Sequence, residues 1–209
     1  MNVVFDFGGV LFDWRPHELL KQCLPDHTAT PQATQALEKL FFEGYGGDWS
    51  EFDRGTLDAA LLAERIAMRT GLSAHEVRRV IDSVPDELQP LPASVDLLHR
   101  LHAAGHALFF LSNMPEPYAR HLEARHDFLR VFRSGIFSAR VQLIKPEAAL
   151  FSHAQAAFGI AGEPTLFIDD LTRNVTAARE AGWQAIHFQD ARQCARELNL
   201  RGLVATGTA

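Results

Sequence analysis

The sequence has few of the features that mark specialised protein classes. Its 209 residues include two cysteines, Cys23 and Cys194, which are far apart and form no Cys-x-x-Cys pair. This excludes a disulfide framework and a cysteine-based zinc site. There is no run of about 18 apolar residues, so we expect no membrane span. The N-terminus lacks the basic region of a secretory signal, and we therefore expect a cytoplasmic protein.

Basic residues are also scarce relative to acidic ones. The chain has 20 lysines and arginines against 26 aspartates and glutamates, and its formal net charge is −6. Proteins that bind nucleic acid usually present a basic face to the phosphates, so this balance argues against nucleic-acid binding. The 47% hydrophobic and 22% charged content is ordinary for a globular protein. The length allows one domain, or one domain with a small insert.

Short, continuous apolar runs recur along the chain, and each is followed by a helical pattern. Such runs are typical of strands that are buried on both faces of a parallel sheet. The predicted strands lie at 3–5, 107–111, 135–138, 164–168 and 183–188. Their alternation with helices predicts an α/β protein with a doubly wound parallel sheet. The small, polar tail from Gly202 onward is expected to fray.

The residues between about 16 and 84 contain no strand pattern. They contain helix start signals instead, such as Thr30 before Pro31 and the capping box of Ser73 and Glu76. Four amphipathic helices are expected, over 16–24, 31–42, 57–70 and 74–81, with a glycine-rich loop over 43–49. The sequence therefore predicts a small helical insert, residues 15–85, in a core formed by residues 1–14 and 86–209.

Polar residues follow three of the buried strands at the point where each strand ends. These residues are Asp6, Ser112, Asn113, Asp169 and Asp170. The carboxyl ends of parallel strands face the same crevice, so we expect these side chains to meet. Mg²⁺ would remove the repulsion between the carboxylates and would also bind phosphate oxygens. Asp6 can then act as a nucleophile on phosphorus, while Lys145 supplies a positive charge.

Two of these stretches resemble motifs of the haloacid dehalogenase (HAD) superfamily. Residues 6–11, Asp-Phe-Gly-Gly-Val-Leu, resemble the first motif, whose leading Asp is the nucleophile. Residues 111–113, Leu-Ser-Asn, are similar to the second motif, whose Ser or Thr binds the phosphoryl group. The resemblance makes Ser112 a phosphoryl ligand. Asn113 is a candidate for substrate contact or for fixing a loop.

The other two motifs follow in the same order, and the resemblance covers nearly the whole chain. Lys145-Pro146 resembles the third motif, whose Lys steadies the nucleophile and the phosphoryl charge. Asp169 and Asp170 match the fourth motif, whose acids hold Mg²⁺. The resemblance implies a Rossmann-like HAD core with an inserted helical cap. It also implies Mg²⁺ held by Asp6, Asp169, Asp170 and the backbone carbonyl of Gly8.

Gly8 is the main departure from the family pattern. Most phosphatases of the superfamily carry a second Asp there, as general acid and base. Two branches share its absence: metal-independent 2-haloacid dehalogenases, and a branch resembling bacterial α-glucose-1-phosphate phosphatases. The Asp169-Asp170 pair, the Arg54-Gly55 pair and Asn174 favour the second branch. Asp13 is a candidate replacement acid, although a hinge cap is its favoured role, and Asn174 is expected to support the Asp169-Asp170 loop.

The resemblance implies a Mg²⁺-dependent phosphatase that acts through an aspartyl-phosphate intermediate. Its substrate would be a small phosphorylated metabolite, with a sugar phosphate as one candidate. Two alternatives remain open, a metal-independent 2-haloacid dehalogenase and a catalytically inactive HAD-like binding module. Glu43, Tyr45 and Trp49 are candidates for substrate contact or for simple packing. The expected assembly is a monomer or a homodimer.

Overall fold

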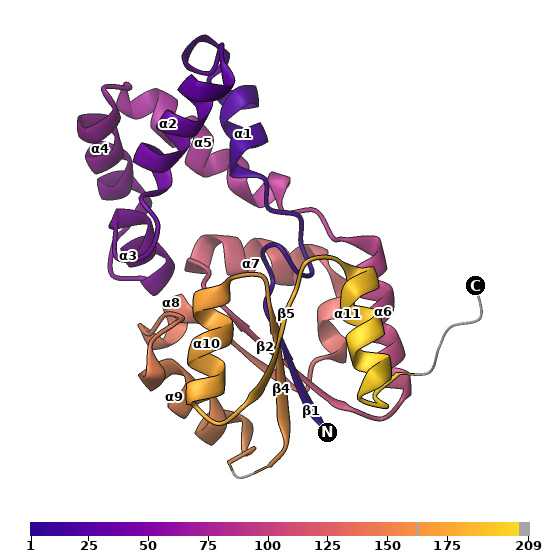
Figure 1. The fold of residues 1–209 in the computed structure, drawn as a ribbon. Coiled ribbons are helices and arrows are strands. Elements are labelled where there is room, and N and C mark those ends of the chain that lie inside the picture. The colour runs from indigo at the N-terminus through magenta and orange to yellow at the C-terminus, as the bar shows by residue number, and fades with distance from the viewer. Residues whose placement is uncertain (162, 205–209) are drawn as a thin grey trace.

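A parallel sheet covered by helices on both faces forms the centre of the molecule (Figure 1). The computed structural model describes residues 1–161 and 163–204. Within these residues the sheet has the strand order β3-β2-β1-β4-β5, and every neighbouring pair is parallel. The strands are β1 (Asn2–Phe5), β2 (Ala107–Ser112), β3 (Ser134–Phe137), β4 (Thr165–Asp169) and β5 (Gln184–His187). The predicted doubly wound α/β fold is confirmed. The fraying predicted from Gly202 onward is wrong for 202–204, because Leu203 and Val204 are buried, and the rest of that tail, 205–209, lies outside the described residues.

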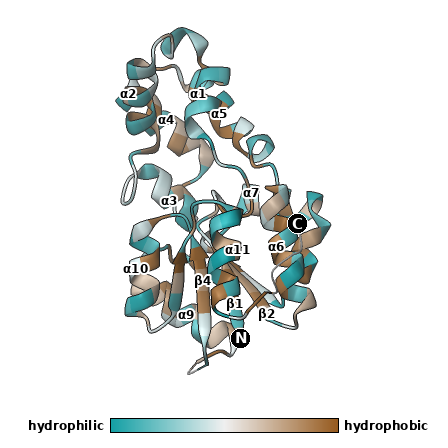
Figure 2. Cartoon of the chain, turned by 45° about the vertical axis from the view of Figure 1, so that its right-hand side comes forward, coloured by the Kyte–Doolittle hydropathy of each residue, from teal (hydrophilic) through white to brown (hydrophobic). Residues whose placement is uncertain are grey.

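The central strand β1 contributes side chains to both faces of the sheet. Val3 and Phe5 belong to one buried hydrophobic cluster, and Val4 belongs to another. The first cluster includes residues of α6 (Pro92–Ala103), α7 (Glu116–Arg125) and α11 (Ala191–Leu200); the second includes residues of α9 (Ala148–Phe158) and α10 (Thr172–Glu180). Figure 2 shows the hydrophobic strands, in brown, between helices with polar outer faces. Burial on both faces explains why the strands are continuous apolar runs in the sequence.

The segment between β1 and α6 folds into a group of helices above the carboxyl ends of the strands (Figure 1). These helices are α1 (Pro16–Cys23), α2 (Pro31–Phe42), α3 (Asp48–Arg54), α4 (Ala59–Thr70) and α5 (Ala74–Glu87). Shorter helical turns elsewhere are η1 (Pro25–His27), η2 (Asp127–Val131) and α8 (Ser138–Val141). Two predicted helix starts are confirmed: the Thr30 hydroxyl accepts from the Ala33 amide at 3.2 Å, and Ser73 and Glu76 form a capping box.

Three predictions for this segment are wrong, and two of them concern α3 and α4. Helix α3 was not predicted, because its seven residues are too few for a periodic pattern and glycines precede it. Helix α4 begins later than predicted, since the carboxylate of Asp58 caps it by accepting from the Leu61 amide at 2.8 Å. Thr56, the residue before the predicted start, donates to the Glu51 carboxylate at 2.6 Å instead of capping the helix. The described segment therefore contains five α-helices where four were expected.

Helix α5 continues to Glu87, beyond its predicted end at Ile81, although Pro85 lies inside it. A proline has no amide hydrogen, so the carbonyl four residues earlier loses its usual donor. That carbonyl belongs to Ile81, and the hydroxyl of Tyr118 in α7 donates to it at 2.7 Å. The side chain of Tyr118, from a helix that covers the sheet, thus replaces the missing hydrogen bond and connects α5 to the core.

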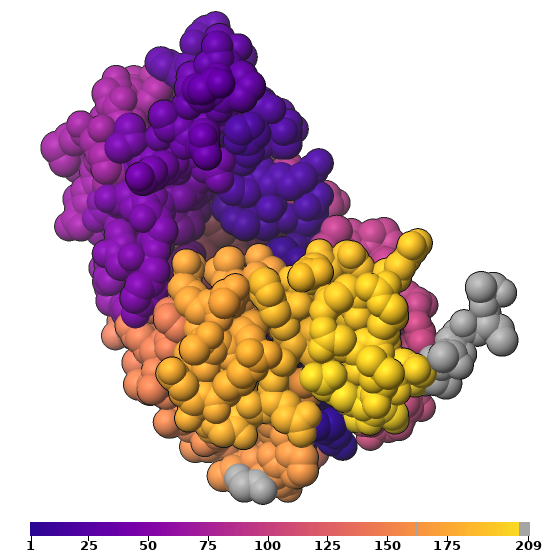
Figure 3. Space-filling view, viewed as in Figure 1, coloured from indigo at the N-terminus to yellow at the C-terminus, as the bar shows by residue number. Residues whose placement is uncertain are grey.

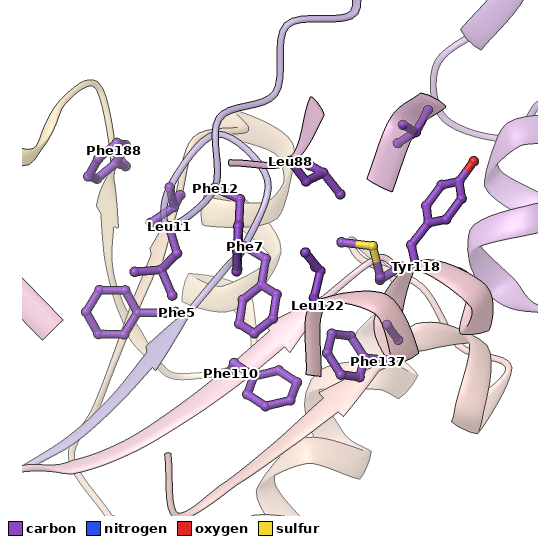
Figure 4. Close-up of a cluster of buried hydrophobic side chains, with 14 of the residues drawn as sticks. Phe5, Phe7, Leu11, Phe12, Leu88, Phe110, Tyr118, Leu122, Phe137 and Phe188 are labelled. Carbon is purple, nitrogen blue, oxygen red and sulfur yellow. The ribbon is translucent and has the colours of Figure 1, made fainter. Parts of the chain in front are cut away.

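The loop after β1 is anchored by aromatic packing (Figure 4). The ring of Phe7 lies 4.6 Å from the ring of Phe110 and 5.4 Å from that of Phe137, measured between centroids. It also lies 5.3 Å from the ring of Phe12, at the other end of the loop. All four side chains are buried. Phe7 lies between Asp6 and Gly8 in the chain, so this packing fixes the backbone of both neighbours.

Two further observations concern the helices and the cysteines. No helix in the described part of the chain has both the length and the apolar character that a membrane span needs. Cys23 and Cys194 are both free thiols, and Cys194 is buried.

Truncation of Phe151 tests the packing of α9 on the sheet. Phe151 is fully buried and meets the rings of Phe167 and Trp183 edge-on, at 5.8 and 5.5 Å. Phe151→Ala should lower the free energy of unfolding by about 3–5 kcal/mol, because it removes these contacts and leaves a cavity. Urea unfolding followed by tryptophan fluorescence measures the change. Met68→Ala, at a side chain that is 79% exposed, is the control and should change stability by less than about 0.5 kcal/mol. Equal losses in the two variants would contradict the packing described here.

Candidate active site

Neighbouring strands bring the predicted acids together. Asp6 directly follows β1, and Asp169 is the last residue of the adjacent strand β4. The amide of Asp6 donates to the carbonyl of Ile168 at 2.9 Å, which holds the two strand ends in register. Asp6, Asp169 and the next residue, Asp170, each offer a carboxylate oxygen, and these oxygens lie within 4.8 Å of one another.

Lys145 lies at the centre of this acidic group. Its ammonium nitrogen is 2.7 Å from Asp6 Oδ1 and 2.8 Å from Asp169 Oδ2, and its side chain is 1% exposed. The amide of Asn113 holds the backbone of Lys145, because Oδ1 accepts from its N–H at 2.8 Å and Nδ2 donates to its carbonyl at 3.0 Å. Asn113 therefore fixes the loop that carries Lys145 (the lysine loop), which is one of its two predicted roles. Substrate contact by Asn113 stays a prediction.

The carboxylate of Asp169 is fully engaged by protein donors. Besides the ammonium of Lys145, it accepts from the amide of Leu171 at 2.8 Å and from Nδ2 of Asn174 at 3.0 and 3.1 Å. Its side chain has no solvent exposure. The predicted support of this loop by Asn174 is confirmed. Asp169 is thus held in place by its neighbours, which leaves Asp170 as the freer of the two adjacent acids.

Close contact between two loops requires glycine opposite Asp170. Gly9 has a φ of +75°, a backbone conformation that residues with a Cβ rarely adopt. A Cβ at this position would lie 2.6 Å from Asp170 Oδ2, closer than such atoms can approach. Gly9 therefore lets the loop after β1 run directly beside the Asp170 carboxylate.

The charges of this cluster do not balance. Burial raises the pKa of Asp6 well above its ordinary value, and the nearby Asp169 and Asp170 carboxylates raise it further against the effect of Lys145. Burial, together with the charge of Asp169, also raises the pKa of Asp170 to about 6. Burial lowers the pKa of Lys145, but its two carboxylate partners outweigh this and raise the pKa overall. One ammonium group thus faces three carboxylates.

This donor set fits a hard divalent cation. Mg²⁺ prefers oxygen ligands and usually takes one or two protein carboxylates. Asp6 and Asp170 supply such oxygens, and a cation would offset the excess negative charge. The carbonyl oxygen of Gly8 accepts no hydrogen bond from the residues that the structure describes, so it is available as a further ligand.

A cavity of about 880 Å³ opens above the cluster, between the sheet and the helical group. Asp6, Gly8, Asn113, Lys145 and Asp170 line it. Figure 3 shows the surface recessed where the violet helices meet the orange and yellow core. The structure therefore brings most of the predicted site residues to one cavity. Ser112 and Asp169 are buried and do not line it.

Aromatic and aliphatic side chains form much of the cavity wall. They include Trp14, Phe42, Trp49, Leu88, Met114 and Tyr118. The ring of Phe42 packs edge-on against Trp14 at 5.6 Å and against Trp49 at 4.7 Å, which makes a continuous aromatic surface. Trp49 both packs and lines the cavity, so both of its predicted roles remain open.

The other two loop candidates have structural contacts. Glu43 accepts from the Asp48 amide at 3.0 Å and pairs with Arg69 at 2.9 Å, so it organises the start of α3. The guanidinium of Arg173 in α10 lies 6.0 Å from the ring centroid of Tyr45, which connects this loop to the core. Both residues also line the cavity.

One acidic residue in the cavity wall was missed in the sequence. Asp53 lies in α3, the helix that was not predicted, and it lines the same cavity as Asp6. Burial raises the pKa of Asp53 to about 8, against the opposing effect of Lys145. The signal that could have found it is the adjacent Arg54-Gly55 pair. Arg54 forms a two-point ion pair with Glu147, at 2.6 and 3.0 Å, beside the lysine loop.

The fold and the four motifs agree with a family match over residues 1–182, and the chain belongs to the haloacid dehalogenase-like hydrolases. The predicted superfamily and the hydrolase class are thus confirmed. The chain is 26% identical over 196 residues to a sesquiterpene phosphatase of Aspergillus oryzae, and the match covers 93% of each protein. It is 24% identical over 189 residues to an (S)-2-haloacid dehalogenase of Pseudomonas putida, covering 87% of this chain and 81% of that one.

A solved structure shows the same fold. It is a HAD family enzyme from Bacteroides thetaiotaomicron in complex with magnesium and inorganic phosphate. It matches 90% of this chain and 93% of its own, with a TM-score of 0.69 and 20% identity. At this identity the likeness concerns the fold alone.

Replacement of Lys145 tests the central ion pairs. Lys145→Met should lower the free energy of unfolding by about 3–5 kcal/mol, because Asp6 and Asp169 would face each other without the cation between them. Adding Asp169→Asn should recover part of the loss, since it removes one of the two unpaired charges. Urea unfolding of the wild type, both single variants and the double variant measures the coupling. A stable Lys145→Met protein, or a double variant whose losses simply add, would show that the cluster does not depend on this cation.

Proposed function

We propose that this protein is a Mg²⁺-dependent phosphatase in which Asp6 attacks the phosphorus of a phosphate monoester. The observation that carries the proposal is the position of Asp6 at the bottom of the cavity, with the ammonium of Lys145 2.7 Å away. An oxygen nucleophile beside a fixed cation suits attack on an anionic phosphoryl group. The resulting aspartyl-phosphate on Asp6 would then be hydrolysed by water.

The metal would be held by Asp6, Asp170 and the Gly8 carbonyl, with Asp169 behind them. Bound Mg²⁺ supplies charge neutralisation at the phosphoryl oxygens. Lys145 keeps the Asp6 side chain oriented and adds positive charge where the phosphoryl group would lie. Ser112, the last residue of β2, carries a hydroxyl that would donate to the same group.

The proposed division into a cap, residues 15–85, and a core, residues 1–14 and 86–209, gives the helical group a function. Helices α2 and α3 line the cavity from the side opposite the strand ends. A cap in this position excludes water from the reacting groups and selects substrates by the shape of its wall. The reducing, cytoplasmic location stays a prediction of the sequence.

The cavity wall favours a substrate whose organic group is apolar. The aromatic surface of Trp14, Phe42 and Trp49 offers contact area but few hydrogen bonds for the hydroxyl groups of a sugar. The relative from Aspergillus oryzae is a sesquiterpene phosphatase, which supports the same choice. We therefore favour an apolar alkyl or terpenoid monophosphate over the sugar phosphate suggested by the sequence.

One observation favours the dehalogenase alternative: the chain is 24% identical to an (S)-2-haloacid dehalogenase. The adjacent carboxylates argue for the phosphatase, because attack on carbon without a metal gives Asp170 no partner for its charge. Metal dependence therefore separates the two reactions.

The first test of the function uses p-nitrophenyl phosphate with and without Mg²⁺. Chelation with EDTA should abolish hydrolysis and added Mg²⁺ should restore it. Asp6→Asn should lower kcat by at least about 10³-fold, as expected for loss of a nucleophile. Asp26→Asn, at an exposed position in η1, is the matched control and should retain wild-type activity. Activity that survives EDTA, or turnover of 2-chloropropionate in its place, would support the dehalogenase.

The second test compares substrates of different polarity. We expect kcat/KM for decyl phosphate to exceed that for glucose 1-phosphate by about 100-fold, because the alkyl chain buries apolar surface against the aromatic wall. Trp49→Ala should lower kcat/KM for decyl phosphate by about 10-fold or more and leave p-nitrophenyl phosphate less affected. A preference for glucose 1-phosphate would restore the sugar-phosphate prediction.

A further inference from the structure

The reaction proposed above needs a proton donor that the loop after β1 does not contain. An alkoxide is a poor leaving group unless it receives a proton as the P–O bond breaks. Gly8 stands where most phosphatases of the superfamily carry the acid. The donor must therefore come from another element that reaches the cavity.

Three carboxylates besides Asp6 and Asp170 line the cavity, and two of them are already paired. Glu38 pairs with the ring of His17 at 3.1 Å, and Glu43 pairs with Arg69 at 2.9 Å. The third is Asp53, whose side chain makes no hydrogen bond or ion pair with any residue that the structure describes. Asp53 is the cavity carboxylate that is free to act on a ligand.

The backbone of Asp53 is fixed to the segment that follows β2. The buried hydroxyl of Ser138 donates to the carbonyl of Asp53 and accepts from the amide of Met114 at 2.8 Å. Met114 is separated from Ser112, the predicted phosphoryl ligand, by a single residue. The end of α3 is therefore held against the loop where the phosphoryl group would bind.

Contacts of the two residues that follow Asp53 strengthen this attachment. Arg54 makes its two-point ion pair with Glu147, and the same guanidinium donates to the carbonyl of Gln142 at 3.2 Å. Gly55 has a φ of +80°, and a Cβ there would lie 2.8 Å from the carbonyl oxygen of Ala139. The chain thus passes over α8 with no space for a larger residue.

Helical spacing places Asp53 on the same side of α3 as Trp49. Residues four apart on a helix project from one face, and both of these residues line the cavity. Trp49 belongs to the aromatic wall proposed to hold the organic group. An ester whose organic part lies against Trp49 would present its bridging oxygen, between carbon and phosphorus, toward Asp53.

The surroundings of Asp53 keep a proton on it at neutral pH. Burial raises its pKa to about 8, and the charged group that opposes this is Lys145. The other titratable neighbour is Tyr118 in α7, whose hydroxyl is occupied by the Ile81 carbonyl. A neutral carboxylic acid in this place is a donor rather than a competing anion.

We propose that Asp53 is the general acid and base of the reaction and takes the part of the acid that is absent at Gly8. This inference rests on the proposed phosphatase function. In the first step an Asp6 oxygen bonds to phosphorus, the P–O bond to the organic group breaks, and the Asp53 proton goes to the departing oxygen. In the second step Asp53 takes a proton from water, the water oxygen bonds to phosphorus, and the P–O bond to Asp6 breaks. The products are alcohol and inorganic phosphate, and Asp53 is protonated again.

The test uses two substrates whose leaving groups differ in basicity. With decyl phosphate, Asp53→Asn should lower kcat/KM by about 10²-fold or more, the usual contribution of a general acid. With p-nitrophenyl phosphate, whose leaving group needs no proton, kcat/KM should stay within about 3-fold of wild type. The second step still needs the base, so kcat should fall and a burst of p-nitrophenolate equal to the enzyme concentration should precede slow turnover.

The pH profile gives an independent readout. Because the protonated form is the donor, kcat/KM of the wild type for decyl phosphate should fall as pH rises through about 8. Asp53→Asn should lose this limb. Asp13→Asn removes the other candidate acid, which pairs with Arg15 at 2.8 Å, and should show no difference between the two substrates.

Failure of this inference can be told apart from failure of the function. A kcat/KM that falls by the same factor on both substrates in Asp53→Asn, without a burst, would give Asp53 a structural role only and overturn the proposal. A selective loss in Asp13→Asn would also overturn it and assign the acid to Asp13. Retained activity in Asp6→Asn would instead remove the phosphatase mechanism on which both steps depend.

Discussion

The ammonium group of Lys145 lies in the protein interior between the carboxylates of Asp6 and Asp169, at 2.7 and 2.8 Å. A buried charge costs several kcal/mol unless partners of opposite charge and well-placed hydrogen bonds surround it. Three segments converge to provide them: β1 leads into Asp6, β4 ends in Asp169, and Asn113 after β2 holds the lysine backbone on both sides. These are the three central strands of the sheet. The strand order brings their carboxyl ends around the ammonium group of Lys145. At the same point the strand order reverses direction, which is where open α/β sheets usually form a crevice.

The position of the helical group above the sheet depends on the same loop. Glu147, two residues after Lys145, receives the guanidinium of Arg54 from α3. On the other side of that loop, Ser138 joins the end of α3 to the segment after β2. The segments that position the charge cluster therefore also hold the helix that covers it. A change that displaces the lysine loop would disturb both the charge cluster and the contacts of α3 with the sheet layer.

The sequence predicted the parts of the structure that local patterns determine. Buried strands are continuous apolar runs, and polar residues at their ends gave the acid cluster without any knowledge of the fold. Helix α3 could not be predicted in this way, because it is short and is stabilised by contacts such as that of Arg54 with Glu147, 93 residues away in the chain. Helix α5 passes Pro85 because Tyr118 replaces a hydrogen bond, which is again a tertiary effect. Asp53 was missed for the same reason as α3: it lines the cavity only because the helical group packs against the sheet layer.

Gly8 need not be glycine for reasons of space. A Cβ there would lie 3.8 Å from Trp14, an ordinary contact, so the loop after β1 could carry a side chain. In the proposed mechanism the acid is on α3 instead, so the nucleophile and the proton donor belong to different parts of the molecule and would work together only when α3 is docked on the core. Trp49 lies one turn from Asp53 on the same helix, so a substrate that fills the apolar wall also stabilises the position of the acid. Substrate selection and proton transfer then depend on one helix. A small phosphate without an apolar group would reach Asp6 but would do little to hold the donor in place.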